Sequence, residues 1–152
     1  MKTVIGVISD THGLVRPEVI SALRCCQLII HAGDMGSPDV IERLEEVAPV
    51  VAVRGNTDKG EWANKFPRTE SVMVGKINFY ILHDLGELDL VPGTAGYNAV
   101  ISGHTHKPLV ERREGVLFLN PGSAGPRRFN LPICFAILEV ENNSLYTRFI
   151  EL

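Results

Sequence analysis

Five short apolar runs in this chain each end close to a side chain that can bind a metal ion. The runs are rich in β-branched residues and mostly lack polar alternation, which is typical of strands buried on both faces. They are TVIGVIS (3–9), QLIIHAG (27–33), PVVAVRG (49–55), INFYIL (77–82) and NAVIS (98–102). Helical character and an early proline mark the two segments between the first three runs, RPEVISALRCC (16–26) and SPDVIERLEEVA (37–48). The first part of the chain is therefore predicted to be β-α-β-α-β.

From Ser71 onward the chain is predicted to form a sheet of hairpins. Turn signals stand at Glu114–Gly115 and at 142–144. The strand-like runs are SVMVG (71–75), KINFYIL (76–82), KPLVERREGVLFLN (107–120), PICFAILEV (132–140) and SLYTRFIEL (144–152). We expect a loop at 59–69 and a loop or short helix at 85–97. A length of 152 residues is ordinary for one domain, so residues 1–152 are predicted to form a single domain.

Charge and hydropathy argue against two classes of partner. The formal net charge of −3 leaves no basic excess for nucleic acid. No apolar run reaches the roughly 18 residues that span a bilayer, and Asp10 interrupts the N-terminal run before a signal-peptide core forms. We therefore expect a cytoplasmic protein without nucleic-acid or membrane partners. The β-rich C-terminal half has edges that can pair with a second copy, so a homo-oligomer stays open.

The three cysteines support the same compartment. Cys25, Cys26 and Cys134 have the spacing of neither a disulfide framework nor a zinc site. We expect reduced, structural thiols.

The polar residues after the five runs are candidate metal ligands. Carboxyl ends of strands in an open α/β sheet line one rim, so residues far apart in sequence can converge there. Positions i and i+2 of extended backbone point to the same side, which pairs Asp10 with His12 and His104 with His106. His31 lies inside an apolar run and is expected to be a core residue or a support for the ligands. The predicted ligands are Asp10, His12, Asp34, Asn56, His83, His104 and His106.

Several of these residues have a structural alternative when taken alone. Asp34 fits an Asx turn or a helix cap, Asn56 fits a turn, and His83 fits a satisfied buried histidine. None of these alternatives predicts that four of the five histidines in the chain follow apolar runs, together with two aspartates and an asparagine. The set as a whole therefore favours a metal site.

Seven protein groups exceed the three or four of a single tetrahedral zinc site, so two ions sharing a carboxylate fit better. Two ions about 3.5–4 Å apart polarise a phosphate and activate a shared water, which describes phosphate-ester hydrolysis. Imidazole, carboxylate and amide ligands suit transition metals rather than a Ca or Mg cage. The expected cofactors are two divalent ions per chain, Mn in the first place, with Ni, Fe or Zn as alternatives.

The ordered motifs DTHG at Asp10, GD at Asp34, GN at Asn56, a histidine at His83 and GHTH at 103–106 resemble those of the calcineurin-like metallophosphoesterase superfamily. RGNTD (54–58) and NPGS (120–123) are similar to its compact prokaryotic phosphodiesterase branch. The resemblance implies a four-layer α/β/β/α sandwich of two mixed sheets flanked by helices, with the site on one rim.

The resemblance also implies roles for the ligands. Asp10, His12 and His106 would hold one metal, Asn56, His83 and His104 the other, and Asp34 would bridge them. A hydroxide between the ions would attack phosphorus.

Three residues are predicted to act in catalysis, Asn56, His83 and Asp58, with Asn56 also touching the phosphate. Many relatives carry a histidine directly after the Gly-Asn pair, whereas this chain has Thr57 and then Asp58. Asp58 or a metal-bound water is the candidate general acid, and a turn cap is the alternative role for Asp58. Asp84 stands where glycine is expected and is predicted to face solvent. Arg54 is expected to be solvated at a strand end, with a phosphate contact as the alternative.

Three functions are compatible with these residues. The first is a dinuclear metal-dependent phosphodiesterase acting on a small phosphate ester. The second is a phosphomonoesterase or nucleotidase. The third is a non-catalytic protein-binding scaffold of the same fold, as in a retromer subunit, although all seven ligand positions here keep ligand-capable residues.

Overall fold

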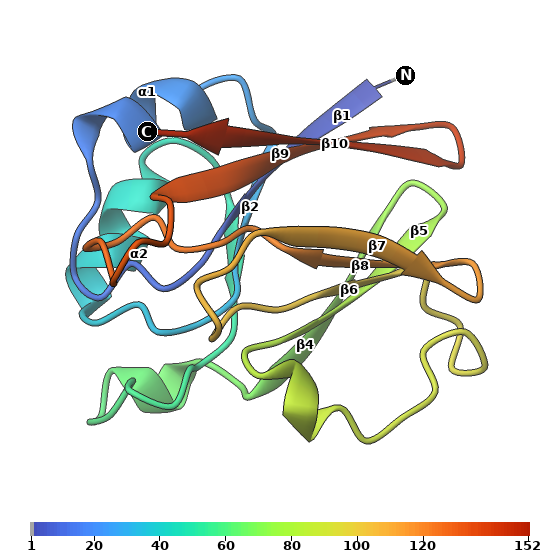
Figure 1. The fold of residues 1–152 in the computed structure, drawn as a ribbon, viewed down its shortest axis with the longest axis horizontal. Coiled ribbons are helices and arrows are strands. Elements are labelled where there is room, and N and C mark those ends of the chain that lie inside the picture. The colour runs from blue at the N-terminus through green and yellow to red at the C-terminus, as the bar shows by residue number, and fades with distance from the viewer. Residues whose placement is uncertain (1) are drawn as a thin grey trace.

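The computed structural model describes residues 2–152 as two five-stranded sheets with two short α-helices (Figure 1). Helices α1 (Pro17–Leu23) and α2 (Pro38–Glu45) separate the first three strands, and the 3-10 turns η1 (Ala63–Lys65) and η2 (Leu85–Glu87) lie in later loops. The strands are β1 (Lys2–Ile8), β2 (Leu28–His31), β3 (Val50–Ala52), β4 (Thr69–Val74), β5 (Ile77–Leu82), β6 (Ala99–Ile101), β7 (Leu109–Arg113), β8 (Val116–Asn120), β9 (Cys134–Glu141) and β10 (Ser144–Glu151). The predicted β-α-β-α-β start is confirmed. The second half is rich in strands, but the prediction that it forms one sheet of hairpins is wrong, because β5, β6 and β8 pair in parallel and the hairpin of β9 and β10 joins the first sheet.

The first sheet has the strand order β10-β9-β1-β2-β3. Strands β1, β2 and β3 are parallel, and their register places Ile8 beside His31 and His31 beside Ala52. Strand β9 returns antiparallel to β1, and β10 forms a hairpin with β9. The three parallel strands therefore end in one row, and the polar segments that follow them start from the same edge.

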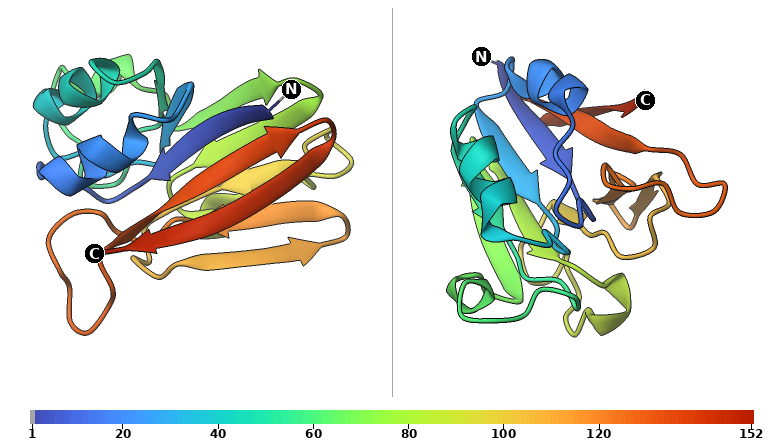
Figure 2. Two further views of the ribbon diagram at one scale, coloured as in Figure 1. Left: turned by 90° about the horizontal axis from the view of Figure 1, so that it is seen from above. Right: turned by 90° about the vertical axis from the view of Figure 1, so that its left-hand side faces the viewer.

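Both helices cover the outer face of this sheet (Figure 2). Val19 and Leu23 of α1 and Val40 and Leu44 of α2 are buried in one cluster with apolar residues of the sheet. Both helices begin at a proline, as predicted, but they end three residues earlier than the predicted segments. Ser37 occupies the N-cap position of α2, although its side chain makes no capping hydrogen bond.

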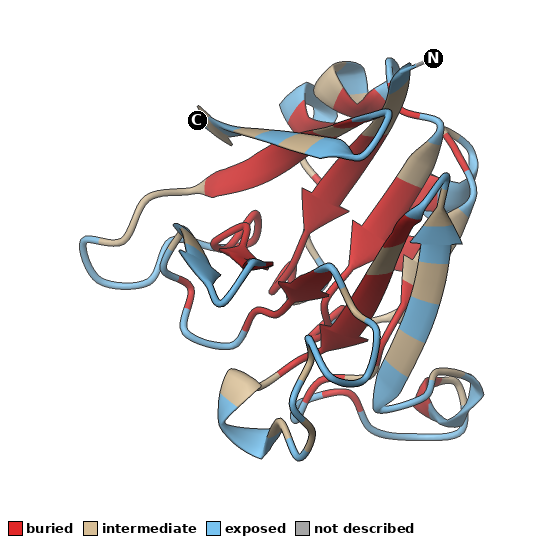
Figure 3. Ribbon diagram, turned by 90° about the vertical axis from the view of Figure 1, so that its right-hand side faces the viewer, coloured by how far each residue is buried: buried red, intermediate tan, exposed pale blue. Residues whose placement is uncertain are grey.

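The second sheet has the order β4-β5-β6-β8-β7, with parallel β5, β6 and β8 at its centre. Two hairpins complete it. Glu114 and Gly115, between β7 and β8, both have positive φ, at 50° and 81°, as the two central residues of a type I′ turn require. Strand β4 alternates exposed and half-buried residues along its length, which fits an edge strand with one face on the core (Figure 3).

The two sheets pack face to face over the main apolar core, to which β1, β2, β5, β6, β8 and β9 all contribute buried side chains. The outer face of the second sheet is covered by the segment that contains η2. Leu85, Leu88, Leu90 and Tyr97 of this segment pack on a cluster that includes Tyr80. The fourth layer of the sandwich is therefore an apolar loop with one 3-10 turn.

Within residues 2–152, no helix is long and apolar enough to cross a membrane.

Candidate metal centre

The predicted ligands follow five strands whose carboxyl ends meet at one rim of the sandwich. Asp10 and His12 follow β1, Asp34 follows β2, Asn56 follows β3, His83 follows β5, and His104 and His106 follow β6. Since β1–β3 lie in the first sheet and β5 and β6 in the second, the site is shared between the sheets. Five of these side chains gather in two overlapping groups, Asp10–His12–His106 and Asp10–Asp34–His83.

Two carboxylates lie among three imidazoles. Oδ1 of Asp10 is 3.3 Å from Nε2 of His106 and 3.9 Å from Nε2 of both His12 and His83. Oδ2 of Asp34 is 3.2 Å from Nε2 of His83 and 3.8 Å from Nε2 of His12. Each carboxylate therefore reaches both groups, and either one is placed to be shared by two ions.

Asn56 and His104 complete the row beside His83. Oδ1 of Asn56 is 3.2 Å from Nδ1 of His104, and the rings of His104 and His83 meet edge to face with centroids 5.1 Å apart. Both residues are exposed and stand outside the two tight groups. Nε2 of His104 faces Oδ2 of Asp84 at 3.9 Å, so Asp84, predicted to face only solvent, also faces a candidate ligand.

Buried atoms without partners show that this donor set fits a cation. Oδ2 of Asp10 accepts hydrogen bonds from Oγ of Ser9 and from the backbone N–H of His104, but Oδ1 is buried and has no hydrogen-bond partner. Nε2 of His83 is also buried without a partner. Its Nδ1 lies 2.8 Å from the carbonyl oxygen of Ala32, so Nδ1 carries the proton there and the Nε2 lone pair faces the carboxylates. A buried carboxylate facing imidazole lone pairs is unfavourable without a cation between them, and a backbone carbonyl is a usual partner for the second nitrogen of a metal-bound histidine.

The pKa shifts agree with a site that attracts positive charge. Burial alone would lower the pKa of His83, but the close approach of Asp34, with Oδ2 3.2 Å from Nε2, and the charge of Asp10 raise it above its ordinary value. Burial would likewise raise the pKa of Asp34, but the approach of His83 and the hydrogen bond from the backbone N–H of Thr57 hold the pKa of Asp34 well below its usual range.

The backbone that carries the ligands is unusual. Asp10, His12, Asp34, His104 and His106 have φ of 55°, 46°, 58°, 73° and 63°, in the left-handed region that few residues other than glycine adopt. Such strained positions cluster at functional sites because the surrounding structure holds them.

Glycines beside the ligands permit close approach. A Cβ on Gly103 would collide with Oγ of Ser9, and one on Gly55 would collide with Oδ1 of Asp34. A larger residue does not fit at either position, which explains why glycine precedes Asn56 and His104 in the sequence motifs.

Asp58, the predicted general acid, is used by the backbone. Its side chain accepts hydrogen bonds from the N–H groups of Met35, Gly36 and Gly55 at 3.0–3.1 Å, and the residue is only 5% exposed. These bonds tie the loop after β3 to the loop after β2. The geometry favours the alternative role in the turn.

His31 is a support for the ligand loops, as predicted. Its Nδ1 accepts from the N–H of Gly33, so its proton is on Nε2 and is donated to Oγ1 of Thr11, which in turn donates to the carbonyl oxygen of Met35. Burial lowers the pKa of His31 to about 4, although the nearby charges of Asp10 and Asp58 act to raise it. The ring is therefore neutral.

Two residues of the NPGS motif, Asn120 and Ser123, also support the loops that carry the ligands. Nδ2 of Asn120 donates to the carbonyl oxygen of Gly103, and Oγ of Ser123 donates to the carbonyl oxygen of Asp10. Asn120 ends β8, the strand beside β6, so its position after an apolar run carried the same signal as the ligands.

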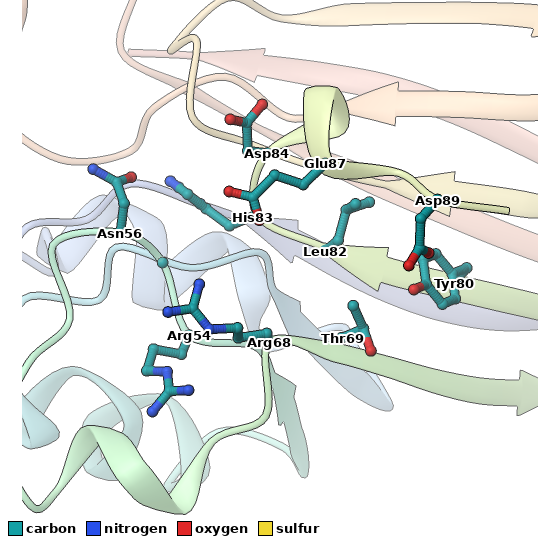
Figure 4. A pocket seen from close by; sticks show the side chains of 11 residues that line it. Arg54, Asn56, Arg68, Thr69, Tyr80, Leu82, His83, Asp84, Glu87 and Asp89 are labelled. Atoms are coloured by element: carbon teal, nitrogen blue, oxygen red, sulfur yellow. The ribbon is translucent and has the colours of Figure 1, made fainter.

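Two cavities flank the centre. One cavity has a volume of about 260 Å³ and is lined by Asn56 and His83 (Figure 4). Its charged lining residues are Arg54, Arg68, Asp84, Glu87 and Asp89. A second of about 240 Å³ is lined by His12 and His106 together with 126–128. Nη1 of Arg54, expected to be solvated, donates to Oδ1 of Asn64, and Arg54 is half-buried.

Comparisons with known proteins place this geometry in a family. The model of the calcineurin-like phosphoesterase superfamily domain matches residues 3–143. A probable metallophosphoesterase from Methanothermobacter thermautotrophicus is 39% identical over 153 residues, covering 93% of this chain and 88% of that protein.

Two solved structures have the same fold. A structure described as a novel archaeal phosphodiesterase superposes with a TM-score of 0.83 at 29% identity, covering all of both chains. Vps29 from Chaetomium thermophilum superposes with a TM-score of 0.79 over 99% of this chain and 97% of its own, at 16% identity, which shows a common fold alone. The sandwich of two mixed sheets that the family resemblance implied is therefore confirmed, although within residues 2–152 α-helices cover the first sheet and a loop with one 3-10 turn covers the second.

Proposed function

The chain belongs to the calcineurin-like phosphoesterase superfamily, and we propose that it is a metal-dependent phosphodiesterase built as one domain of residues 1–152. The similarity to an archaeal phosphodiesterase along the whole chain supports this activity. The observation that carries the proposal is the unpartnered Oδ1 of Asp10, buried between the imidazoles of His12, His83 and His106. Such an arrangement gains stability when a divalent cation is bound.

We assign the ligands in two sets. Asp10, His12 and His106 would hold one ion, and Asn56, His83 and His104 would hold the other. Asp34 is the shared carboxylate in this assignment, because its Oδ2 reaches both His12 and His83. Oδ1 of Asp10 has a comparable position and is the second candidate for sharing.

Bound divalent ions supply two effects in such a site: they activate a water as nucleophile and neutralise charge on the phosphoryl oxygens. The residues of this chain supply the rest. The carbonyl of Ala32 keeps Nε2 of His83 directed at the centre, and His31 and Asp58 fix the loops that carry Asp10 and Asp34. The Asn56 amide, exposed at the rim, orients the phosphate. Because the Asp58 oxygens are occupied, the proton for the leaving group comes from water.

The mixed donor set of imidazole, carboxylate and amide suits Mn, Ni, Fe or Zn, and Mn is the first candidate in this proposal. The cytoplasm stays the proposed location. Strands β10 and β7, one edge strand from each sheet and both in the C-terminal half, are the places where a second copy would pair.

The scaffold alternative is disfavoured by the intact donor set. Vps29 shares the fold, but a surface that only binds protein has no need of a buried carboxylate oxygen and buried imidazole nitrogens without hydrogen-bond partners. The monoesterase alternative shares the site and differs only in substrate.

The test combines metal analysis with two substrates. After purification with Mn, we expect close to two ions per chain, and bis-p-nitrophenyl phosphate should be hydrolysed faster than p-nitrophenyl phosphate. His104→Ala should lower diester hydrolysis by at least about a hundredfold while the far-UV spectrum is retained. Lys107→Ala, in the same loop and exposed, is the control and should keep activity. A protein that binds no metal contradicts the proposal, and faster monoester hydrolysis assigns the second alternative.

A further inference from the structure

Charges of both signs line the 260 Å³ cavity beside His83 without pairing with each other. Arg54 and Arg68 lie on one side, and Asp84, Glu87 and Asp89 lie on the other (Figure 4). Among the described residues 2–152, no ion pair joins either arginine to any of these carboxylates. Such a cavity is complementary to a guest that carries both charges.

We propose that this cavity binds the ester group of a zwitterionic phosphodiester, in which one alcohol is a short amino alcohol with a cationic nitrogen. The proposal rests on the phosphodiesterase function above and names its substrate class. The phosphate lies at the end formed by Asn56 and His83, and the ammonium group lies against Glu87 and Asp89.

The phosphate end is defined by the candidate centre itself. Asn56 and His83 line both the cavity and the row of ligands, so a diester with phosphorus at the centre directs one of its ester groups into the cavity. His83 is 5% exposed, and its Nε2 faces Oδ2 of Asp34 in the candidate metal centre, so the cavity adjoins the proposed ions at this end. The arginines add positive charge for phosphoryl oxygens, and Arg54 is held in place by Asn64.

The ammonium end is defined by the carboxylates and by an aromatic ring. Asp84, in the loop after β5, is tied to that loop by the N–H of Gly86, and Glu87 and Asp89 follow within the same segment. Tyr80 also lines the cavity, and its ring is packed against Tyr97 with centroids 4.9 Å apart. Tyr80 is only 7% exposed and bounds the cavity, so the carboxylates supply the attraction for an ammonium group.

Size and charge argue against other ester groups. A volume of about 260 Å³ is below the range of pockets that hold drug-sized ligands, which favours a small head group. An additional anionic group would face three carboxylates and be repelled, and a neutral alcohol would leave them without counter-charge.

The test uses two diesters that differ in one atom. In p-nitrophenyl phosphorylcholine the nitrogen is cationic, and in p-nitrophenyl 3,3-dimethylbutyl phosphate a carbon replaces it. In both, a water oxygen bonds to phosphorus, the bond from phosphorus to the nitrophenyl oxygen breaks, and nitrophenolate leaves. Each contact of the ammonium group with an exposed carboxylate of the cavity contributes modestly to binding. We therefore expect kcat/KM to be about tenfold higher for the choline ester.

Replacing two carboxylates should remove the preference. In the double variant Glu87→Gln/Asp89→Asn, the ratio of the two kcat/KM values should fall toward one. Asp84 is left unchanged because it faces His104. The control is the double variant Glu45→Gln/Glu141→Gln, which makes the same change in net charge at exposed positions on α2 and β9 and should keep the ratio. Thermal melts establish that both variants are folded.

A binding measurement separates failure of this inference from failure of the proposed function. By calorimetry on the Mn-loaded protein, phosphocholine should bind about tenfold more tightly than 3,3-dimethylbutyl phosphate. If neither diester is hydrolysed, the phosphodiesterase function fails, while calorimetry still decides what the cavity prefers. Equal affinities, or a kcat/KM ratio near one in the unaltered protein, overturn the inference.

Discussion

Asn120 donates a hydrogen bond from Nδ2 to the carbonyl oxygen of Gly103 at 2.9 Å, and the same amide lies 3.1 Å from Oγ1 of Thr105. Its Oδ1 accepts from the N–H of Gly122. The end of β8 thereby holds the loop that presents His104 and His106 after β6.

Asn120→Asp should weaken metal binding. The substitution keeps the acceptor for Gly122 but turns a second oxygen toward the carbonyl of Gly103, which releases the loop. Loss of a group that supports ligands typically reduces metal affinity about 10–100-fold, and competition with a chromophoric chelator measures it. Asn130→Asp, on an exposed loop, should bind Mn as the unaltered protein does. Equal affinity in the Asn120 variant would contradict this role.

The buried His31 makes the metal-free protein sensitive to acid. Its pKa is about 4 in the folded protein against an ordinary value of 6.5, because burial disfavours the charged ring. The unfolded chain therefore binds more protons in this range, and stability that is complete above about pH 6.5 is lost as the pH falls toward 4. The loss is on the order of 3 kcal/mol.

His31→Gln removes this titration while offering a similar donor and acceptor. Urea unfolding of both metal-free proteins should show the unaltered protein more stable at pH 7.5, with the difference shrinking toward pH 4.5. Other titrating groups largely cancel in this difference. A difference that stays constant with pH is the result that counts against a neutral, buried His31.

Asp58 should prove structural rather than acidic in catalysis. Asp58→Asn leaves at least one of the three backbone N–H groups poorly paired, at a cost of about 1–3 kcal/mol in the free energy of unfolding. Diesters with good and poor leaving groups should lose activity by the same factor. A much larger loss for the poor leaving group would restore Asp58 as the general acid, because proton donation matters most there.

The thiol of Cys25 should react faster than those of Cys26 and Cys134. Cys25 is exposed, whereas Cys26 and Cys134 are buried. Burial and the neighbouring Cys25 raise the pKa of Cys26 to about 12, and burial with the charge of Glu151 raises the pKa of Cys134 to about 11. With a disulfide reagent at pH 8, we expect one fast thiol in the native chain and three after unfolding. Cys25→Ser should remove the fast thiol, and any fast reaction that persists would contradict the assigned burial.

Much of the fold followed from local patterns. The β-branched runs became β1, β2, β3, β5 and β6, and the turn signals at Glu114–Gly115 and at Asn142 became hairpins with positive φ. Helix lengths were less predictable, since the apolar pattern continues through Cys26 while α1 ends at Leu23. The apolar cover of the second sheet contains no α-helix because Pro92 and Gly93 interrupt its segment, for which the local pattern had left a loop or a short helix open.

The sequence by itself determined which donors stand at the strand ends, because burial on both faces dictates the apolar runs and parallel strands end at a common rim. It could not determine the distances across that rim, because these depend on how the two sheets pack. Only the tertiary structure brings Oδ1 of Asp10 among three imidazoles, and only there do three backbone N–H groups occupy Asp58. Arg68 and Glu87 likewise face one cavity only because the loops before β4 and after β5 fold over the same end of the second sheet.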